Sequence, residues 1–192
     1  MKKLVSFPLA LLSMGLLAGC SHIANPAVPS TPPVTVVPHD TATDGAMMAH
    51  KDVTTEEEFI VRMIPHHQEA VDTSMIIVAK TENKELKAIA QGIIDAQKKE
   101  ITELNGWLKS WYPTSTLATE HNTMMRDLTK LSGHELDDAY MEDMVKHHEW
   151  AIDMAQEVLE VSQRSEIVTL AKNIIASQTS EIETFKKMLN DH

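Results

Sequence analysis

The stretch that decides the fold of this chain is Met-Ile-Pro-His-His-Gln-Glu-Ala at residues 63–70, because it occurs twice. It returns at 144–151 as Met-Val-Lys-His-His-Glu-Trp-Ala, and residues 59–111 align with 140–192 at the same spacing without a gap. Apolar positions around the motif stay apolar in both copies. The repeat is too long to be one unit of a solenoid, so it indicates a helical hairpin that was duplicated.

Apolar residues recur at helical spacing within each copy. The pattern predicts helices over about 54–80 and 84–111 in the first copy, and over about 134–161 and 165–189 in the second. Thr54 or Thr55 is the expected N-cap of the first helix, and Asn83 is the expected break before the second. We therefore predict an all-α protein, a ferritin-like antiparallel four-helix bundle made of two duplicated hairpins over residues 54–192.

Three local features of this bundle are expected to depart from a regular helix pattern. Pro65 removes a backbone donor inside the first helix and should bend it at the His pair. Pro113 should end the second helix. The connector over 112–133 is expected to contain a short helix around 120–131, with a helix stop at Gly133.

The N-terminal part of the chain has the pattern of an export signal. Lys2 and Lys3 precede an apolar run over 4–17, which is followed by Leu-Ala-Gly-Cys at 17–20. This pattern resembles a bacterial lipoprotein signal, so 1–19 is predicted to be a lipoprotein signal peptide and Cys20 the lipidated residue. Ser21 after the Cys implies, by the same resemblance, the outer membrane. An ordinary soluble export signal and a buried apolar helix are the alternatives.

Residues 20–53 contain five prolines among Ser, Thr, Val and Ala, which is typical of a disordered tether. The tether would hold the bundle on the periplasmic side of the cell envelope. Whether its histidines and methionines bind metal stays open at this point. These are His39, Met47, Met48 and His50.

The charge and the cysteine content exclude several functions. The chain has 28 acidic and 17 basic residues and a formal net charge of -11. Such a surface repels phosphate backbones, so nucleic-acid binding is not expected. A single cysteine cannot form a disulfide or a thiolate metal cluster within one chain.

The repeated motif places soft and borderline metal ligands on one face of each helix. Residues three and four apart are neighbours on a helix, so each motif Met lies beside both histidines that follow it. Imidazole suits several first-row metals and thioether favours Cu(I), whereas Met is a poor zinc ligand. The sequence therefore predicts a copper site, with Cu(I) favoured and Cu(II) bound through the imidazoles as the alternative. The predicted ligands are Met63, His66, His67, Met144, His147, His148 and Met154.

A second pair of polar positions recurs in the repeat. Gln97 and Glu100 in the first copy correspond to Gln178 and Glu181 in the second, and they interrupt apolar stripes. A metal-bound His usually donates its other N–H to a carboxylate or carbonyl. We predict that these four residues orient the His rings, and a solvated helix edge is the alternative for the Glu pair.

Two other classes of function compete with copper binding. The motif could be inherited as packing in a helical interaction domain that binds no metal. A metal-dependent oxidoreductase is the weaker alternative, because di-iron bundle enzymes use Glu-x-x-His and both copies here carry Met in place of that Glu. We therefore expect a binding protein and not an enzyme.

The two motif segments resemble the bacterial family of domains of unknown function numbered 305. Members of that family have ferritin-like bundles with Met-Ile-Pro-His-His-Gln-x-Ala-x-x-Met-Ala segments, and include periplasmic copper-binding proteins of the CopM type. The resemblance covers about 54–192 and implies copper binding, sequestration or tolerance. This chain departs from the pattern at Thr73 and Lys146, and it carries Glu69 and Trp150 where the resemblance implies a small residue. Thr73 replaces a family Met, so the second copy is expected to bind the metal more tightly.

Overall fold

The computed structural model describes residues 52–117 and 123–191. Four helices account for most of them: α1 (Glu56–Lys80), α2 (Lys84–Trp111), α3 (Gly133–Val161) and α4 (Ser165–Asn190). No strand occurs among the described residues. The predicted all-α four-helix bundle is confirmed, and the helices begin and end within two residues of the expected positions.

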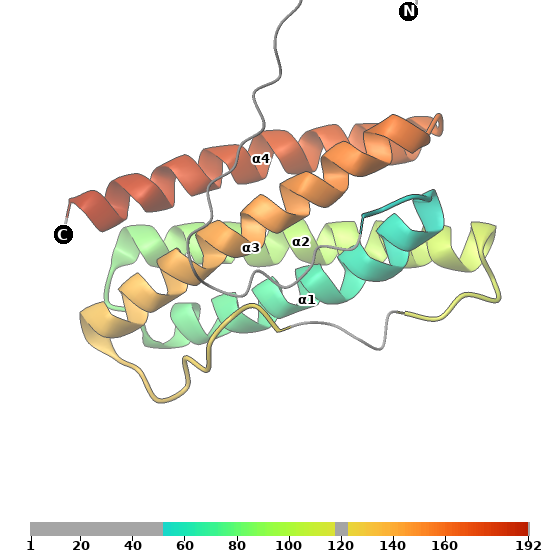
Figure 1. Cartoon of the computed structure of the whole chain (residues 1–192). Helices are drawn as coiled ribbons and strands as arrows, with labels where there is room; N and C mark the ends of the chain where they lie inside the picture. Colours follow the sequence, from blue (N-terminus) through green and yellow to red (C-terminus); the bar gives the residue numbers. More distant parts are fainter. Residues whose placement is uncertain (1–51, 118–122, 192) are drawn as a thin grey trace, which may run out of the picture. The chain divides into compact units, whose positions relative to one another are not determined.

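The two copies of the repeat form two hairpins that lie against each other (Figure 1). Within the hairpins α1 packs on α2 and α3 packs on α4, and the two hairpins meet mainly through α1 and α3. The helices that carry the repeated motif therefore form the interface between the two copies. None of the four helices is long and apolar enough to cross a bilayer.

The expected N-terminal caps of the first hairpin are present. The Thr55 hydroxyl accepts a hydrogen bond from the Glu58 N–H at 3.1 Å at the start of α1. The Asn83 side chain accepts from the backbone N–H groups of Glu85 and Leu86 at 3.0 and 3.1 Å at the start of α2. These contacts satisfy donors that the first turn of a helix leaves unpaired. Helix α1 continues through Pro65 as one helix.

The prediction of a helix around 120–131 is wrong for the described part of that segment, because residues 123–131 contain no helix. Three backbone donors at the start of this segment go to carboxylates on the helices of the bundle. The N–H groups of Met124 and Met125 donate to Glu69 Oε1 at 2.8 and 3.0 Å. The N–H of Arg126 donates to Asp143 Oδ2 at 2.9 Å. Tertiary contacts therefore override the helical pattern of this segment.

The end of the connector is a tight turn that leads into α3. The Asp127 carboxylate accepts from the backbone N–H and the hydroxyl of Thr129, a local contact that competes with helix formation. Gly133 has a φ of +58°, in the left-handed region that favours glycine. It stands at the first position of α3, so it begins this helix where the sequence suggested a stop.

The apolar core divides into two clusters, named here after Tyr140 and Phe59. The Tyr140 cluster includes Ala70, Ile77, Ile93, Met144 and Phe185, and the Phe59 cluster includes Met63, Leu104, Ala151, Met154 and Ile174. Along both α1 and α3, the His pair lies between the residues of one cluster and those of the other. The repeated histidines therefore occupy a polar layer in the middle of the bundle.

The predicted signal peptide over 1–19, Cys20, and the tether residues up to 51 lie outside the described residues, and so do His39, Met47, Met48 and His50. The last residue of the predicted tether belongs to the bundle. Val53 is buried in the Phe59 cluster, and its N–H donates to Glu157 Oε2 at 2.8 Å.

Candidate metal centre

The four histidines of the repeated motif form one buried layer, which we call the His layer. His66 is 2% exposed, and His67, His147 and His148 are 0% exposed. The rings of His66 and His147 come together from α1 and α3, with centroids 3.7 Å apart and planes inclined by 32°. The centroids of the two adjacent rings within each motif are 6.2 Å apart. His66 and His147 are therefore the inner pair, and His67 and His148 turn toward the partner helix of their own hairpin.

Each outer histidine contacts the carboxylate that the repeat predicted. His67 Nε2 lies 2.8 Å from Glu100 Oε2 on α2, and His148 Nε2 lies 2.7 Å from Glu181 Oε2 on α4. The two contacts are equivalent in the repeat. Glu100 and Glu181 therefore touch the histidines, which a solvated helix edge does not explain. Their role toward a metal stays a prediction.

These contacts leave one nitrogen of each outer ring for another partner. A carboxylate beside Nε2 favours a proton on that atom, so that Nδ1 carries the lone pair. Neither nitrogen of these two rings makes a well-aligned hydrogen bond among the described residues, but Nε2 has a carboxylate oxygen within 2.8 Å. Buried imidazole nitrogens in this state fit a metal ion, because a metal would satisfy the lone pair that the protein leaves unpaired.

Gln97 and Gln178 are also buried, one turn before the two Glu residues. Their side-chain oxygens have no hydrogen-bond partner in the described part of the chain. Their placement is thus equivalent in the two copies, as is that of the Glu pair. The predicted contact of these amides with the His rings stays a prediction.

The two inner histidines have different neighbours. His147 Nε2 lies 3.6 Å from Glu69 Oε2, whereas His66 meets the Trp150 ring edge-on with centroids 5.8 Å apart. Glu69 and Trp150 occupy equivalent positions of the repeat, so the layer is symmetric in its histidines but not in what surrounds them. Burial lowers the pKa of His147 from 6.5 to about 4, and the nearby Glu69 offsets this only in part. His147 is therefore neutral at pH 7 and has a lone pair to offer.

The predicted thioethers are buried and are divided between the two core clusters. Met63 and Met154 belong to the Phe59 cluster, whereas Met144 belongs to the Tyr140 cluster. The structure brings the two motifs together at the rings of His66 and His147. No three His, Cys, Asp or Glu side chains converge as a metal site among the described residues. The donor set is thus a His layer with thioethers in the core cluster on each side.

Glu69 is a residue of this site that the sequence reasoning did not assign. Its contact is with a histidine of the other hairpin, and helical spacing along α1 gives no sign of it. The available signal was indirect: the position is occupied by Trp150 in the second copy and departs from the family pattern.

The chain is similar to solved structures that hold metal ions. It is 31% identical to CopM in the Cu(II)-bound form, covering 71% of this chain and 97% of that one with a TM-score of 0.64. The Cu(I)-bound form of CopM gives 31% identity, coverage of 71% and 96%, and a TM-score of 0.66. CopM has also been solved in a silver-bound form.

Two relatives without an assigned function match as well. A putative secreted DUF305 protein from Streptomyces coelicolor is 25% identical, with coverage of 69% and 90% and a TM-score of 0.64. Uncharacterized protein L153 of Acanthamoeba polyphaga mimivirus is 38% identical over 53 residues, which are 28% of this chain and 35% of the viral protein. The chain thus spans about a third of that curated relative. The model of the family "Domain of unknown function (DUF305)" matches residues 56–189, and the chain therefore belongs to the DUF305 family.

Proposed function

We propose that this chain binds copper through the His layer, for sequestration or tolerance of the metal. The observation that carries the proposal is the buried layer itself, in which two rings meet across the hairpins and two are held by carboxylates. The similarity to CopM, which has been solved with Cu(I), Cu(II) and silver, supports the choice of metal. Cu(I) is the favoured state, because thioethers flank the layer.

The residues of the layer would hold the metal in two ways. The Nδ1 atoms of His67 and His148 are candidate ligands, since their Nε2 atoms already face carboxylates. Met63, Met144 and Met154 supply soft sulfur atoms from the adjoining core. The carboxylates would fix the orientation of the rings and increase their basicity as ligands.

Metal retention by the purified full-length chain tests this proposal. The protein is loaded with Cu(I) without oxygen, or with Cu(II), then dialysed, and the bound copper is measured by elemental analysis. Replacement of all four histidines by Ala should abolish retention. Replacement of the exposed His134 by Ala, outside the layer, should leave it unchanged. The proposal is contradicted if the variant without the four histidines retains copper like wild type. It is also contradicted if the wild-type chain retains no copper.

We further propose that the chain is an exported lipoprotein anchored at Cys20 on the periplasmic side of the envelope, in the outer membrane. The N-terminal sequence pattern supports this location, and so does the similarity to a DUF305 protein described as secreted. The change Cys20→Ala should move the protein from the membrane fraction to the soluble fraction. Equal membrane association of wild type and variant contradicts the anchor.

The proposal is one of binding and not of catalysis. It rests on Met63 and Met144, which stand where a di-iron bundle enzyme carries Glu. The copper-loaded chain should show no steady turnover of oxygen with reductants such as ascorbate or a phenol, beyond that of the four-His variant. Sustained turnover that needs the His layer contradicts this part of the proposal.

A further inference from the structure

Glu69 and His147 break the symmetry of the His layer. The repeat places Glu69 and Trp150 at equivalent positions, and Glu69 faces His147 whereas Trp150 meets the His66 ring edge-on. The two copies of the repeat thus differ in chemistry at this position, with a carboxylate in the first and an indole in the second.

The distance between Glu69 and His147 is longer than the distances between the outer histidines and their carboxylates. Glu100 and Glu181 lie 2.8 and 2.7 Å from their histidines, which are donor–acceptor distances of ordinary hydrogen bonds. Glu69 Oε2 lies 3.6 Å from His147 Nε2, which is long for a hydrogen bond. Two ligand atoms at about 2.1 Å from one first-row ion are separated by about 3 to 4 Å, depending on the angle at the metal. The pair is therefore spaced like two ligands of one ion.

The carboxylate of Glu69 is held in place from its other oxygen. Oε1 accepts hydrogen bonds from the backbone N–H groups of Met124 and Met125, while Oε2 is the oxygen nearest to His147. The side chain is 11% exposed, so it lies between the layer and the surface. Two fixed donors on one oxygen restrict the rotation of the carboxylate and keep the other oxygen near the ring.

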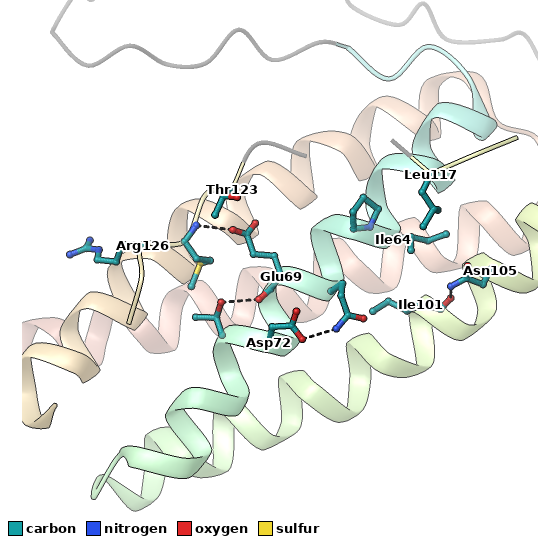
Figure 2. A pocket seen from close by; sticks show the side chains of 12 residues that line it. Ile64, Glu69, Asp72, Ile101, Asn105, Leu117, Thr123 and Arg126 are labelled. Atoms are coloured by element: carbon teal, nitrogen blue, oxygen red, sulfur yellow. Dashed lines mark hydrogen bonds between the residues drawn. The ribbon is translucent and has the colours of Figure 1, made fainter. Parts of the chain in front are cut away.

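A cavity gives access to this carboxylate from the surface. It has a volume of about 600 Å³ and is lined by α1, α2 and the connector, with Glu69, Asp72 and Met125 among its residues (Figure 2). The charged residues of its lining are Glu69, Asp72 and Arg126, so carboxylates outnumber cations at the opening. The cavity also has room for the water molecules that would complete the coordination of an ion held by only two side chains.

From this geometry we infer that Glu69 and His147 form a site for Cu(II) beside the soft Cu(I) ligands of the layer. Carboxylate, imidazole and water are N and O ligands, which suit Cu(II), whereas the thioethers suit Cu(I). This inference rests on the proposed copper binding and adds to it a residue that selects the oxidation state. A chain with both kinds of ligand could retain copper before and after its reduction.

Paired affinity measurements on the full-length chain test the inference. Cu(II) binding is followed by electron paramagnetic resonance during titration with cupric chloride, and Cu(I) affinity by competition with bicinchoninate without oxygen. Glu69→Gln keeps an amide oxygen that can accept from Met124 and Met125 but removes the carboxylate from His147. This variant should lose one Cu(II) equivalent, or bind it about tenfold or more weakly, with unchanged Cu(I) affinity.

Two further variants complete the design. Glu69→Asp keeps the charge but withdraws the carboxylate by one methylene, so it should also weaken Cu(II) binding. Glu149→Gln removes an exposed charge that pairs with Lys186, and it should bind both ions like wild type. Circular dichroism and melting curves verify that each variant is folded.

The outcomes separate the two proposals. Wild-type Cu(II) affinity in both Glu69 variants overturns the inference and leaves copper binding by the His layer standing. Binding of Cu(I) but not Cu(II) by the wild-type chain also overturns the inference and leaves copper binding by the His layer standing. Failure of the wild-type chain to retain either ion overturns the proposed function together with the inference.

Discussion

At the scale of single residues, the histidines of the layer are distinguished by the atoms that face them. His67 and His148 each face a carboxylate of the same hairpin, whereas His147 faces Glu69 across the interface. A buried imidazole without partners would cost about 1 to 3 kcal/mol. The carboxylates thus offset part of this cost, and in the proposed copper site they would leave Nδ1 of His67 and His148 for the metal.

The carboxylates of α2 and α4 should tune the affinity of the copper site. Glu100→Gln and Glu181→Gln keep an oxygen near Nε2 but remove the charge, so the rings become less basic ligands. Each change should weaken copper binding by about 10- to 100-fold. Glu103→Gln is the matched control on α2, because Glu103 is 42% exposed and lies 4.0 Å from Lys99. Competition titrations measure the affinities, and equal values for all three variants contradict a positioning role.

A buried hydroxyl pair between the hairpins gives a prediction about stability. Ser74 Oγ and the Tyr140 hydroxyl lie 2.8 Å apart, and both side chains are fully buried. Burial raises the pKa of Tyr140, so this hydroxyl stays protonated. Ser74→Ala leaves it without that partner and should lower the free energy of unfolding by about 1 to 3 kcal/mol in urea denaturation.

The repeat itself supplies the control for this pair. The equivalent residues in the other half are Ala155 and Phe59, which are buried together in the Phe59 cluster. The double variant Ser74→Ala, Tyr140→Phe should therefore recover most of the lost stability, because no polar group is left unpaired. If the double variant is as unstable as the sum of the two single variants, the hydroxyl pair is not the cause.

At the scale of whole helices, one carboxylate joins three helix ends. Glu56, at the start of α1, accepts hydrogen bonds from the hydroxyl groups of Ser162 and Tyr112 at 2.6 and 3.0 Å. It also accepts from Arg164 Nε at 3.1 Å, and the Arg164 guanidinium stacks 4.1 Å above the Trp111 ring. The end of α2 and the turn between α3 and α4 are thus fastened to the first residue of α1.

This contact makes stability depend on pH. Burial alone would raise the pKa of Glu56, but the hydrogen bonds from Ser162, Arg164 and Tyr112 together hold it below its ordinary 4.5. A folded-state pKa below the unfolded value stabilises the protein above pH 4.5, and this stability is lost as the pH falls through the folded-state pKa. The stability difference between wild type and Glu56→Gln should therefore shrink as the pH is lowered from 6 to 3. A constant difference, measured by urea denaturation at each pH, contradicts the role of this carboxylate.

The second helices of the two hairpins begin differently. Asn83 caps α2 with two hydrogen bonds, whereas its counterpart Arg164 at the start of α4 makes no side-chain cap. Asn83→Ala should lower stability by about 1 kcal/mol, and Asn83→Asp should retain most of it because Asp is an equally good cap. Thermal melting of the three proteins measures the effect. An Asp variant as unstable as the Ala variant contradicts the capping explanation.

At the scale of the whole molecule, the His layer lies where the two hairpins meet. A metal bound there contacts residues of α1 and α3 together only in the folded protein, so binding should stabilise the bundle by mass action. Free copper at 100 times its dissociation constant should add about 2.7 kcal/mol to the free energy of unfolding. The melting temperature should rise with the copper concentration in wild type and stay constant in the four-His variant. An equal shift in both proteins indicates binding outside the layer.

The periodicity of the sequence was sufficient to predict most of the fold. Neighbours three and four apart lie on one face of a helix whatever surrounds it, so the helix bounds follow from the chain alone. So does the placement of each Met beside its histidines. The repeat then predicted two equivalent hairpins, and in the structure Glu100 and Glu181 contact equivalent histidines of the two copies.

The contacts between the hairpins depended on tertiary structure. The crossing of α1 and α3 brings the inner rings together and places Met63 and Met144 in different clusters. This crossing cannot be predicted from the spacing of residues along one helix. The same crossing brings Glu69 to His147, and the carboxylate then binds the connector backbone that was expected to be helical. Local hydrogen bonding and side-chain spacing are encoded over a few residues. Contacts between segments distant in the sequence exist only once the whole core has packed.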